Sequence, residues 1–236
     1  MLERGESCEG SSTIVLVAAL DEEKGIQLTL AELRHHLPNS KFLVVDGNSS
    51  DKTVVAAENQ GAKVLHQKGK GKGDAIAFGL RNIDSEPDYV VFIDADYTYP
   101  SEFIPKMIRV LENNPEVGMV SGNRFNSHMH VGAMRDLFYI GNRLLALAHN
   151  LMNGINLRDP LTGLRVVRGD IIINWEPKSS GFDIEVELNH HIERQGYTIM
   201  EVEIPYRERV GQKKLKLRHA LPILNRIVTE GIRMRD

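Results

Sequence analysis

Residues 90–100 read VVFIDADYTYP, an apolar run rich in β-branched and aromatic residues that leads into an Asp-x-Asp pair. The run predicts a buried strand at Tyr89–Asp94, and the stretch behind it predicts a helix at Ser101–Asn113. Asp94 and Asp96 would then lie at the rim of a sheet. Because Mg²⁺ typically binds one or two carboxylates plus substrate phosphates, this pair indicates a metal site. The alternative is a turn whose aspartates cap the following helix.

The residues before and after this stretch alternate between short apolar runs and amphipathic segments. Strands are expected at Thr13–Ala19, Lys41–Asp46, Ala62–His66 and Val117–Gly122, with helices at Glu22–Leu37, Thr53–Gln60 and Asp74–Ile83. Continuous apolar strands that alternate with helices are typical of a parallel sheet covered on both faces. The expected fold class is therefore α/β with a mostly parallel central sheet.

The second half of the chain is less regular. Its patterns predict helices at Met134–Met152 and Ile184–Arg194, strands at Gly163–Val167 and Thr198–Pro205, and a last helix that begins at Pro222. No internal repeat and no low-complexity linker divides the sequence. Residues 1–236 are therefore expected to form one domain.

Polar residues follow several of the predicted strands. In sheets of this kind, ligands bind beyond the carboxyl ends of the strands. The residues expected to meet there are Asp21-Glu22, Asp46, Asp94-Ala95-Asp96 and Ser121–Arg124. Their convergence predicts a single site.

Two polar segments are candidate ligand loops. VVDGNSSDKT (44–53) runs from a strand into a turn where Asp46 could accept a hydrogen bond from a nucleobase, although such turns are also common as plain loops. KGKGKGDA (68–75) has glycines that allow close backbone approach, and Lys70 or Lys72 could reach a phosphate. It is not a P-loop, because no Ser or Thr follows Gly-Lys at the required position. A solvated lysine loop is the alternative.

Charge and composition restrict the partners. The net charge of −3 disfavours bulk nucleic-acid binding, yet nine Lys or Arg between Arg207 and Arg235 face only Glu208 and Glu230. No apolar run approaches the roughly 18–20 residues that span a bilayer. The polar N-terminus lacks the apolar region of a signal peptide, and Cys8 is the only cysteine, so a reduced, cytosolic setting is expected.

Eight segments occur in an order that resembles family 2 glycosyltransferases, which have the three-layer α/β/α GT-A fold. More narrowly, the order is similar to the branch that transfers hexoses to dolichyl or polyprenyl phosphate, and the resemblance covers about residues 13–217. The segments are VAALDEEKGI (17–26), VVDGNSSDKT (44–53), GKGKGDA (69–75), FIDADYTYP (92–100), SGNR (121–124), DPLTGLR (159–165), FDIEVEL (182–188) and VEIPYRERVGQKKL (202–215).

The resemblance implies two sets of residues on the donor side. The nucleotide-sugar set comprises Ala18, Leu20, Glu22, Asp46, Asn48, Lys72, Asp94, Ala95 and Asp96, in which Ala18 and Leu20 replace the family's usual proline and tyrosine. The metal set comprises Asp94 and Asp96 for Mg²⁺ or Mn²⁺, with Thr98 where many relatives have a glutamine as third ligand.

The resemblance also implies an acceptor set and a catalytic set. Arg124, Arg143, Arg165 and Lys214 would bind the acceptor phosphate, and the implied catalytic residues are Asp94, Asp96, Asp159, Glu185 and Arg209. Residues 13–122 would form the nucleotide-sugar half and 123–212 the acceptor half. Residues 213–236 would form a basic amphipathic C-terminal segment.

The implied activity is an inverting transfer of a hexose from a UDP- or GDP-sugar to a dolichyl or polyprenyl phosphate. A soluble phosphorylated or saccharide acceptor is the main alternative. A nucleotidyltransferase would need its Gly-rich signature after the first strand, where VAALDEE stands, and a non-catalytic sugar-nucleotide-binding module is the third alternative.

A lipid acceptor implies attachment to the membrane surface. The basic cluster Lys213, Lys214, Lys216 and Arg218 precedes the amphipathic helix Pro222–Met234, and Met134–Met152 would be a second contact. The expected location is the cytoplasmic face of the membrane, as a peripheral protein. The competing interpretation is that both helices pack on the domain or form a homodimer interface.

Overall fold

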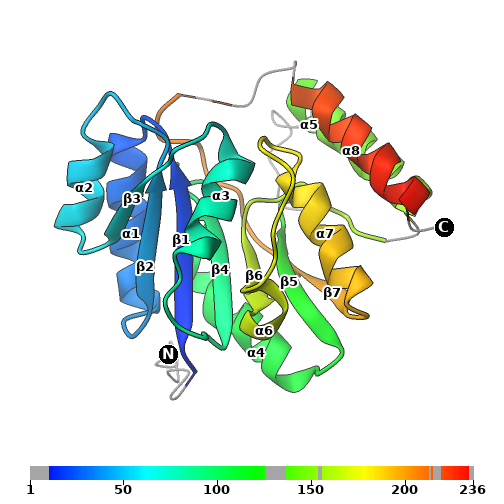
Figure 1. Cartoon of the computed structure of the whole chain (residues 1–236), viewed down its shortest axis with the longest axis horizontal. Coiled ribbons are helices and arrows are strands. Elements are labelled where there is room, and N and C mark those ends of the chain that lie inside the picture. The colour runs from blue at the N-terminus through cyan, green and yellow to red at the C-terminus, as the bar shows by residue number, and fades with distance from the viewer. Residues whose placement is uncertain (1–10, 126–136, 154–155, 213, 215–218, 234–236) are drawn as a thin grey trace.

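A seven-stranded sheet forms the centre of the computed structural model, which describes residues 11–125, 137–153, 156–212, 214 and 219–233 (Figure 1). The strands lie in the order β3-β2-β1-β4-β6-β5-β7. Their bounds are β1 (Thr13–Ala19), β2 (Lys41–Asp46), β3 (Lys63–His66), β4 (Tyr89–Asp94), β5 (Val117–Asn123), β6 (Arg165–Arg168) and β7 (Thr198–Glu203).

The direction of β6 determines how the second half of the chain reaches the site. β1 pairs in parallel with β2 and β4, β2 with β3, and β5 with β7, whereas β6 runs antiparallel between β4 and β5. Phe92 and Ser121 both face Arg165 across the ladder. Because β6 is reversed, its first residues meet the last residues of the parallel strands. The DPLTG loop (159–163), which precedes β6, therefore lies at the carboxyl edge of the sheet.

Helices cover both faces of the sheet. One face packs on α1 (Glu23–His36), α2 (Thr53–Asn59) and α4 (Ile104–Asn113), which follows the short 3₁₀ helix η1 (Ser101–Phe103). The other face packs on α3 (Lys72–Arg81), α6 (Gly169–Ile172) and α7 (Ile184–Arg194). Alternate residues of a strand point to opposite faces, so Val15 and Val17 join the first layer while Ile14 and Leu16 join the second.

Two further helices lie beside each other at one end of the molecule (Figure 1). α5 (Leu137–Asn153) and α8 (Ala220–Arg233) pack together, and α8 also contacts α7. A small cluster around Val186, Ile223 and Ile227 joins them to the body of the molecule. Among the described helices, none combines the length and the apolar character that a membrane crossing requires.

The predicted elements agree closely with the observed ones. Strands β1, β2 and β4 and helix α7 have the expected bounds. The last helix begins at Ala220 rather than Pro222, β7 ends at Glu203, and the single turn α6 was not expected. Cys8, the start of the predicted helix Met134–Met152, and Lys213, Lys216 and Arg218 lie outside the described residues.

Candidate active site

The first carboxylate of the Asp-x-Asp pair is held by a lysine. Lys72, the first residue of α3, places Nζ 2.5 Å from Oδ1 of Asp94 and 2.6 Å from Oε1 of Glu185 in the first turn of α7. On the other side, a Cβ at position 163 would collide with Oδ2 of Asp94, so only glycine lets the DPLTG loop approach this carboxylate. Three segments distant in sequence therefore meet at Asp94.

The second carboxylate has partners of its own. Thr98 donates to Oδ1 of Asp96 through its hydroxyl at 2.6 Å and its backbone N–H at 3.2 Å, and Nη1 of Arg209 lies 2.6 Å from Oδ2. Arg209 also donates to Glu22 Oε1 through Nη2. The backbone N–H of Val210 donates to the carbonyl of Asp96, which fastens the segment that carries Arg209 over the strand end. Arg209 thus joins the ends of β1 and β4.

A bidentate pair lies at the end of β5. Arg124 donates to Asp159 through Nε at 2.6 Å and Nη2 at 2.8 Å, and its own N–H reaches the same carboxylate at 3.1 Å. The guanidinium carbon lies 5.3–5.9 Å from the ring centroids of Tyr99, Phe125 and Tyr206. Arg143 of α5 stands over Phe125 at 5.4 Å. Two of the predicted acceptor arginines therefore share one aromatic ring.

The structure corrects the expected role of Arg165. Its side chain is only 2% exposed, and Nε and Nη2 donate to the carbonyls of Thr162 and Pro160 at 2.9 and 2.7 Å. Nη1 donates to Oδ1 of Asn189 at 2.5 Å. A guanidinium buried in this way holds the DPLTG loop in place and is not accessible to an acceptor phosphate.

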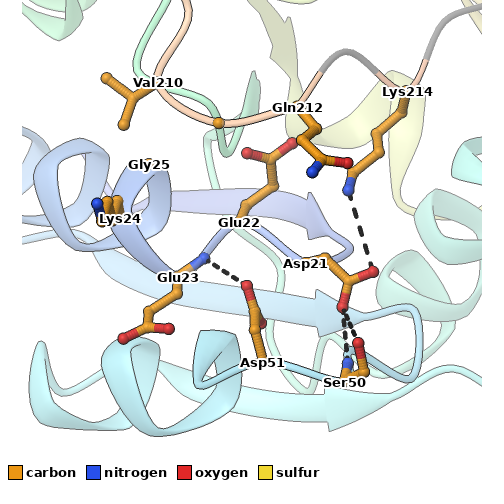
Figure 2. A pocket seen from close by; sticks show the side chains of 11 residues that line it. Asp21, Glu22, Glu23, Lys24, Gly25, Ser50, Asp51, Val210, Gln212 and Lys214 are labelled. Carbon is orange, nitrogen blue, oxygen red and sulfur yellow. Dashed lines mark hydrogen bonds and ion pairs between the residues drawn. The ribbon is translucent and has the colours of Figure 1, made fainter.

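A pocket of about 500 Å³ opens beside the end of β1 (Figure 2). Glu22 and the start of α1 form one wall, and Ser50 and Asp51 of the loop after β2 form another. The third wall is the segment from Val210 to Lys214. Lys214 was expected at the acceptor phosphate, but its Nζ lies 4.0 Å from Oδ2 of Asp21 in this pocket. The structure therefore places Lys214 beside Asp21 in the lining of this pocket.

The predicted base-binding residues organise the loop after β2. Asp46 is 2% exposed and accepts hydrogen bonds from the N–H groups of Asn48 and Ser49 at 3.0 and 3.1 Å. Asn48 adopts φ 65° and donates its side-chain amide to the carbonyl of Gln67 at 3.2 Å. Leu20 is exposed and Ala18 is partly buried against the core. In this arrangement the carboxylate of Asp46 shapes the turn.

Comparison with known proteins identifies the family. Residues 14–175 match the sequence model described as Glycosyl transferase family 2. The chain belongs to this family. It is 30% identical over 203 residues to a dolichyl-phosphate hexose transferase of Haloferax volcanii, with 85% of each chain covered. It is also 30% identical over 217 residues to an undecaprenyl-phosphate mannosyltransferase of Micrococcus luteus, with 86% of each chain covered.

Other relatives of this family 2 glycosyltransferase are longer or more distant. A dolichol-phosphate mannosyltransferase of Pyrococcus furiosus is 24% identical over 86% of this chain and 58% of its own length. Among solved structures, glucosyl-3-phosphoglycerate synthase of Mycobacterium tuberculosis in complex with UDP has a TM-score of 0.74 at 21% identity, covering 94% of this chain and 80% of that chain. The same synthase was solved with Mn²⁺, UDP and phosphoglyceric acid, with a TM-score of 0.74 at 20% identity, covering 94% of this chain and 79% of that chain. The predicted GT-A fold and the assignment as a glycosyltransferase enzyme are confirmed.

The Asp94 and Asp96 pair of this family 2 enzyme has the chemistry that a divalent ion requires. The described residues contain no group of three or more His, Cys, Asp or Glu side chains that could hold a metal. Mg²⁺ needs only one or two carboxylates when substrate phosphates supply further oxygens, and Asp94 and Asp96 offer such a pair. Thr98, the expected third ligand, is fully buried and spends its hydroxyl on Asp96. The hydroxyl of Thr98 is thus engaged by Asp96, and its role as a third ligand stays a prediction.

Burial and close charges shift the pKa values of the enzyme's site. Burial works to lower the pKa of Lys72, but the carboxylates of Asp94 and Glu185 outweigh it and raise this pKa. Burial and the charge of Asp94 raise the pKa of Asp96. Burial also raises the pKa of Glu22 to about 7, against the opposing effect of Arg209. Lys72 therefore stays protonated between the carboxylates of Asp94 and Glu185.

Several residues of the enzyme's site were not predicted. Tyr99 is buried and accepts a hydrogen bond at 2.7 Å from the N–H of Gly163. Asp51 accepts from the N–H groups of Glu23 and Thr53 at 3.1 and 2.9 Å and so ties α1 to α2. Tyr99 lies in FIDADYTYP and Asp51 lies in VVDGNSSDKT, and their place in these motifs was the signal that the sequence offered. Their partners lie in other segments, so no local pattern indicated these roles.

Proposed function

We propose that this glycosyltransferase moves a hexose from a UDP- or GDP-sugar to a dolichyl or polyprenyl phosphate, with inversion and with Mg²⁺ or Mn²⁺. The order of side chains along the sheet edge carries the proposal. Asp21 and Glu22 follow β1, Asp94 and Asp96 lie at the end of β4, and Arg124 follows β5. With β6 between β4 and β5, three strand spacings of about 4.8 Å separate β1 from β5. That span suits a nucleoside, a diphosphate, a sugar and an acceptor phosphate in sequence.

The chemistry assigns a separate task to each position. Asp94 and Asp96 would hold the divalent ion, which when bound supplies positive charge beside the departing diphosphate. Arg124, held rigid by Asp159, orients the acceptor phosphate together with Arg143. An oxygen of that phosphate forms the new bond to the anomeric carbon, while the bond from this carbon to the nucleoside diphosphate breaks.

The acceptor proposed here needs little proton transfer. The second pKa of a phosphate monoester is about 6, so the attacking oxygen is already anionic near neutral pH. Positioning and charge stabilisation therefore account for the expected catalysis without a general base. Direct displacement from the side opposite the leaving group inverts the configuration of the sugar.

An apolar face next to the acceptor arginines supports a lipid acceptor. Large apolar side chains are exposed along both α5 and α8. They are Leu144, Leu147 and Leu151 of α5 and Leu221, Leu224, Val228 and Ile232 of α8, and we call them the apolar face. Arg143 belongs to the same helix as the first three. Glu230 of α8 is 1% exposed and forms ion pairs with Arg194 and Arg226. The carboxylate of Glu230 is therefore not exposed beside the apolar face.

Membrane attachment follows from the proposed acceptor. Exposing each CH₂ of a lipid chain to water costs about 0.8 kcal/mol, so the enzyme must come to the bilayer surface. The apolar face would lie on the membrane, with the basic residues that precede α8 in the sequence against anionic headgroups. The relatives named above for lipid phosphates support this reading. We propose the cytoplasmic face of the membrane as the location, and a homodimer through the same helices is the competing use.

Transfer to a short polyprenyl phosphate tests the proposal. Radiolabelled UDP- and GDP-hexoses are supplied with Mg²⁺ or Mn²⁺, and label that passes into the organic phase is counted. We expect one donor to give extractable product whose anomeric configuration, measured by NMR, is inverted. Label that appears only in a soluble phosphorylated or saccharide product would establish the alternative acceptor class. Retention of configuration would exclude direct displacement.

A further inference from the structure

Both carboxylates of the Asp-x-Asp pair are already occupied by cations of the chain. Lys72 Nζ lies 2.5 Å from Asp94, and Arg209 Nη1 lies 2.6 Å from Asp96. These are the oxygens that the proposed function assigns to a divalent ion. An ammonium or guanidinium at hydrogen-bonding distance competes with a metal for the same lone pairs, because both need the negative charge of the oxygen.

Each cation also has a second carboxylate. Lys72 lies 2.6 Å from Glu185, whose side chain is 8% exposed, and Arg209 donates to Glu22, which is similarly buried. The second carboxylate keeps each cation in the site if the first is given up. Nζ of lysine has three donors on a flexible stem, so it can turn toward a new anion without leaving Glu185.

Two buried polar atoms mark where a ligand would complete this arrangement. Oε2 of Glu22 and Nε of Arg209 have no hydrogen-bond partner within the described part of the chain. Glu22 lines the pocket, and Arg209 directly precedes Val210, which lines it as well. Buried groups of this kind are costly unless a ligand or water satisfies them. The paired side chains of Glu22 and Arg209 therefore each keep one buried polar atom that a ligand could satisfy.

We propose that Lys72 and Arg209 are internal counterions that exclude the metal until the donor's diphosphate arrives. This inference rests on the proposed function. The diphosphate draws the two cations onto its own oxygens, and the carboxylates of Asp94 and Asp96 become free to take the divalent ion. Metal and nucleotide sugar then bind cooperatively. The diphosphate draws the two cations away from Asp94 and Asp96, and the metal supplies new positive charge to these carboxylates.

Manganese binding without any acceptor tests the inference. Free Mn²⁺ is followed by electron paramagnetic resonance in titrations of the intact chain, alone and with UDP or GDP. Because reciprocal coupling between sites is typically 5–150-fold, we expect one nucleotide to tighten Mn²⁺ binding by about tenfold or more. Equal Mn²⁺ affinity with and without both nucleotides would overturn the inference.

The substitution Lys72→Gln separates an internal counterion from an ordinary donor ligand. Loss of a competing charge-assisted bond should tighten the binding of Mn²⁺ alone by about tenfold or more and reduce the gain from nucleotide. A residue that only binds phosphate would leave the affinity for Mn²⁺ alone unchanged, and that result would also overturn the inference. Lys68→Gln, a change at an exposed lysine of the same loop, is the matched control and should behave like the wild type.

A second variant keeps the inference testable if Lys72→Gln does not fold. Arg209→Gln removes the other counterion, and circular dichroism establishes whether each variant is folded. If Lys72→Gln does not fold, unchanged binding of Mn²⁺ alone by folded Arg209→Gln contradicts the inference. The titrations involve no sugar transfer, so failure to glycosylate polyprenyl phosphate would remove the proposed function and leave the counterion result intact.

Discussion

At the scale of single residues, the site contains more carboxylates than its cations can pair one to one. Lys72 is shared by Asp94 and Glu185, and Arg209 is shared by Asp96 and Glu22. Sharing leaves negative charge at the end of β4, since each cation balances only one of its two acids. A divalent ion held by Asp94 and Asp96 would offset this negative charge. The consequences can be measured one side chain at a time.

Replacing either aspartate of the pair should stop transfer while the fold survives. Asp94→Asn or Asp96→Asn removes one of two carboxylate ligands, and a loss of turnover of about 100-fold or more is expected for a metal-dependent step. EDTA should have the same effect on the wild type. Asp170→Asn, a change at an exposed aspartate of α6, is the control and should retain activity. Full turnover in either of the first two variants would remove the metal assignment.

Glu193 predicts a pH dependence of stability away from the site. Burial raises its pKa from 4.5 to about 7 in the folded state. Below 4.5 the side chain is neutral in both states, and above 7 the folded state must bury a charge, so stability falls as pH rises between these values. Glu193→Gln should remove this fall and raise the free energy of unfolding at pH 8 by up to about 3 kcal/mol.

Urea denaturation of both proteins at a series of pH values measures this difference. The two free energies of unfolding should converge toward pH 4 and separate steadily up to pH 7, with no further separation above it. Parallel curves across the whole range would show that Glu193 titrates alike in the folded and unfolded chain.

At the scale of elements, α5 and α8 pack against the rest of the molecule on one side only. Their inner residues join the small cluster at Val186, Ile223 and Ile227, while the apolar face remains exposed. Exposed apolar patches on a single protein often mark a protein or membrane contact. Arg143, which we propose as an acceptor arginine, belongs to α5 and favours the membrane.

Sedimentation with anionic liposomes tests this use of the two helices. The wild type should pellet at low salt, and a triple change of Leu144, Leu147 and Leu151 to Gln should release most of it, since burying each Leu contributes about 1.5–3 kcal/mol. Leu28→Gln alters a similarly exposed leucine on α1 and should leave pelleting unchanged. Changing Lys213, Lys214, Lys216 and Arg218 to Gln should weaken pelleting and its salt dependence.

Two results would contradict the membrane assignment. Absence of pelleting at low salt would remove it altogether. A wild type that is dimeric in sedimentation velocity, and becomes monomeric in the triple leucine variant, would show that a second copy of the chain covers the apolar face instead.

At the scale of the whole molecule, the sheet arranges two groups of candidate binding residues along one edge. The pocket beside Glu22 is bordered by Lys214, whereas Arg124 and Arg143 lie beyond Asp94 around Phe125. The division of the chain into functional parts stays a prediction. Its parts are a nucleotide-sugar half at 13–122, an acceptor half at 123–212 and a C-terminal segment at 213–236. Because Lys214 lies beside Asp21, the pocket that we propose for the donor is lined by residues far apart in the sequence.

This arrangement predicts a separation of kinetic effects. Arg143→Ala should weaken acceptor use by tens of fold and leave UDP or GDP affinity nearly unchanged, because a charge-assisted bond contributes about 1.5–3 kcal/mol. Lys214→Gln should weaken nucleotide binding instead. Calorimetry with nucleotide and KM values for each substrate measure the two effects. If Arg143→Ala lowers nucleotide affinity, this arginine belongs to the donor site.

The sequence by itself determined the layers of the fold and the position of the Asp94 and Asp96 carboxylates. Apolar residues run continuously through the buried strands and recur every three to four positions in helices, so the bounds of β1, β2, β4 and α7 could be predicted from neighbouring residues alone. Parallel topology then placed Asp94 and Asp96 at the rim. These properties are local, or follow from a general rule of α/β sheets.

The tertiary structure decided which charged side chains remain available. Arg165 follows a motif that suggested an acceptor ligand, yet the antiparallel insertion of β6 buries its guanidinium against Asn189 and the DPLTG loop. Lys214 and Arg209 reach the end of β1 from nearly two hundred residues away. Whether a cation meets solvent, a carboxylate or a carbonyl depends on contacts that no periodicity encodes, because burial and pairing arise only when distant segments pack together.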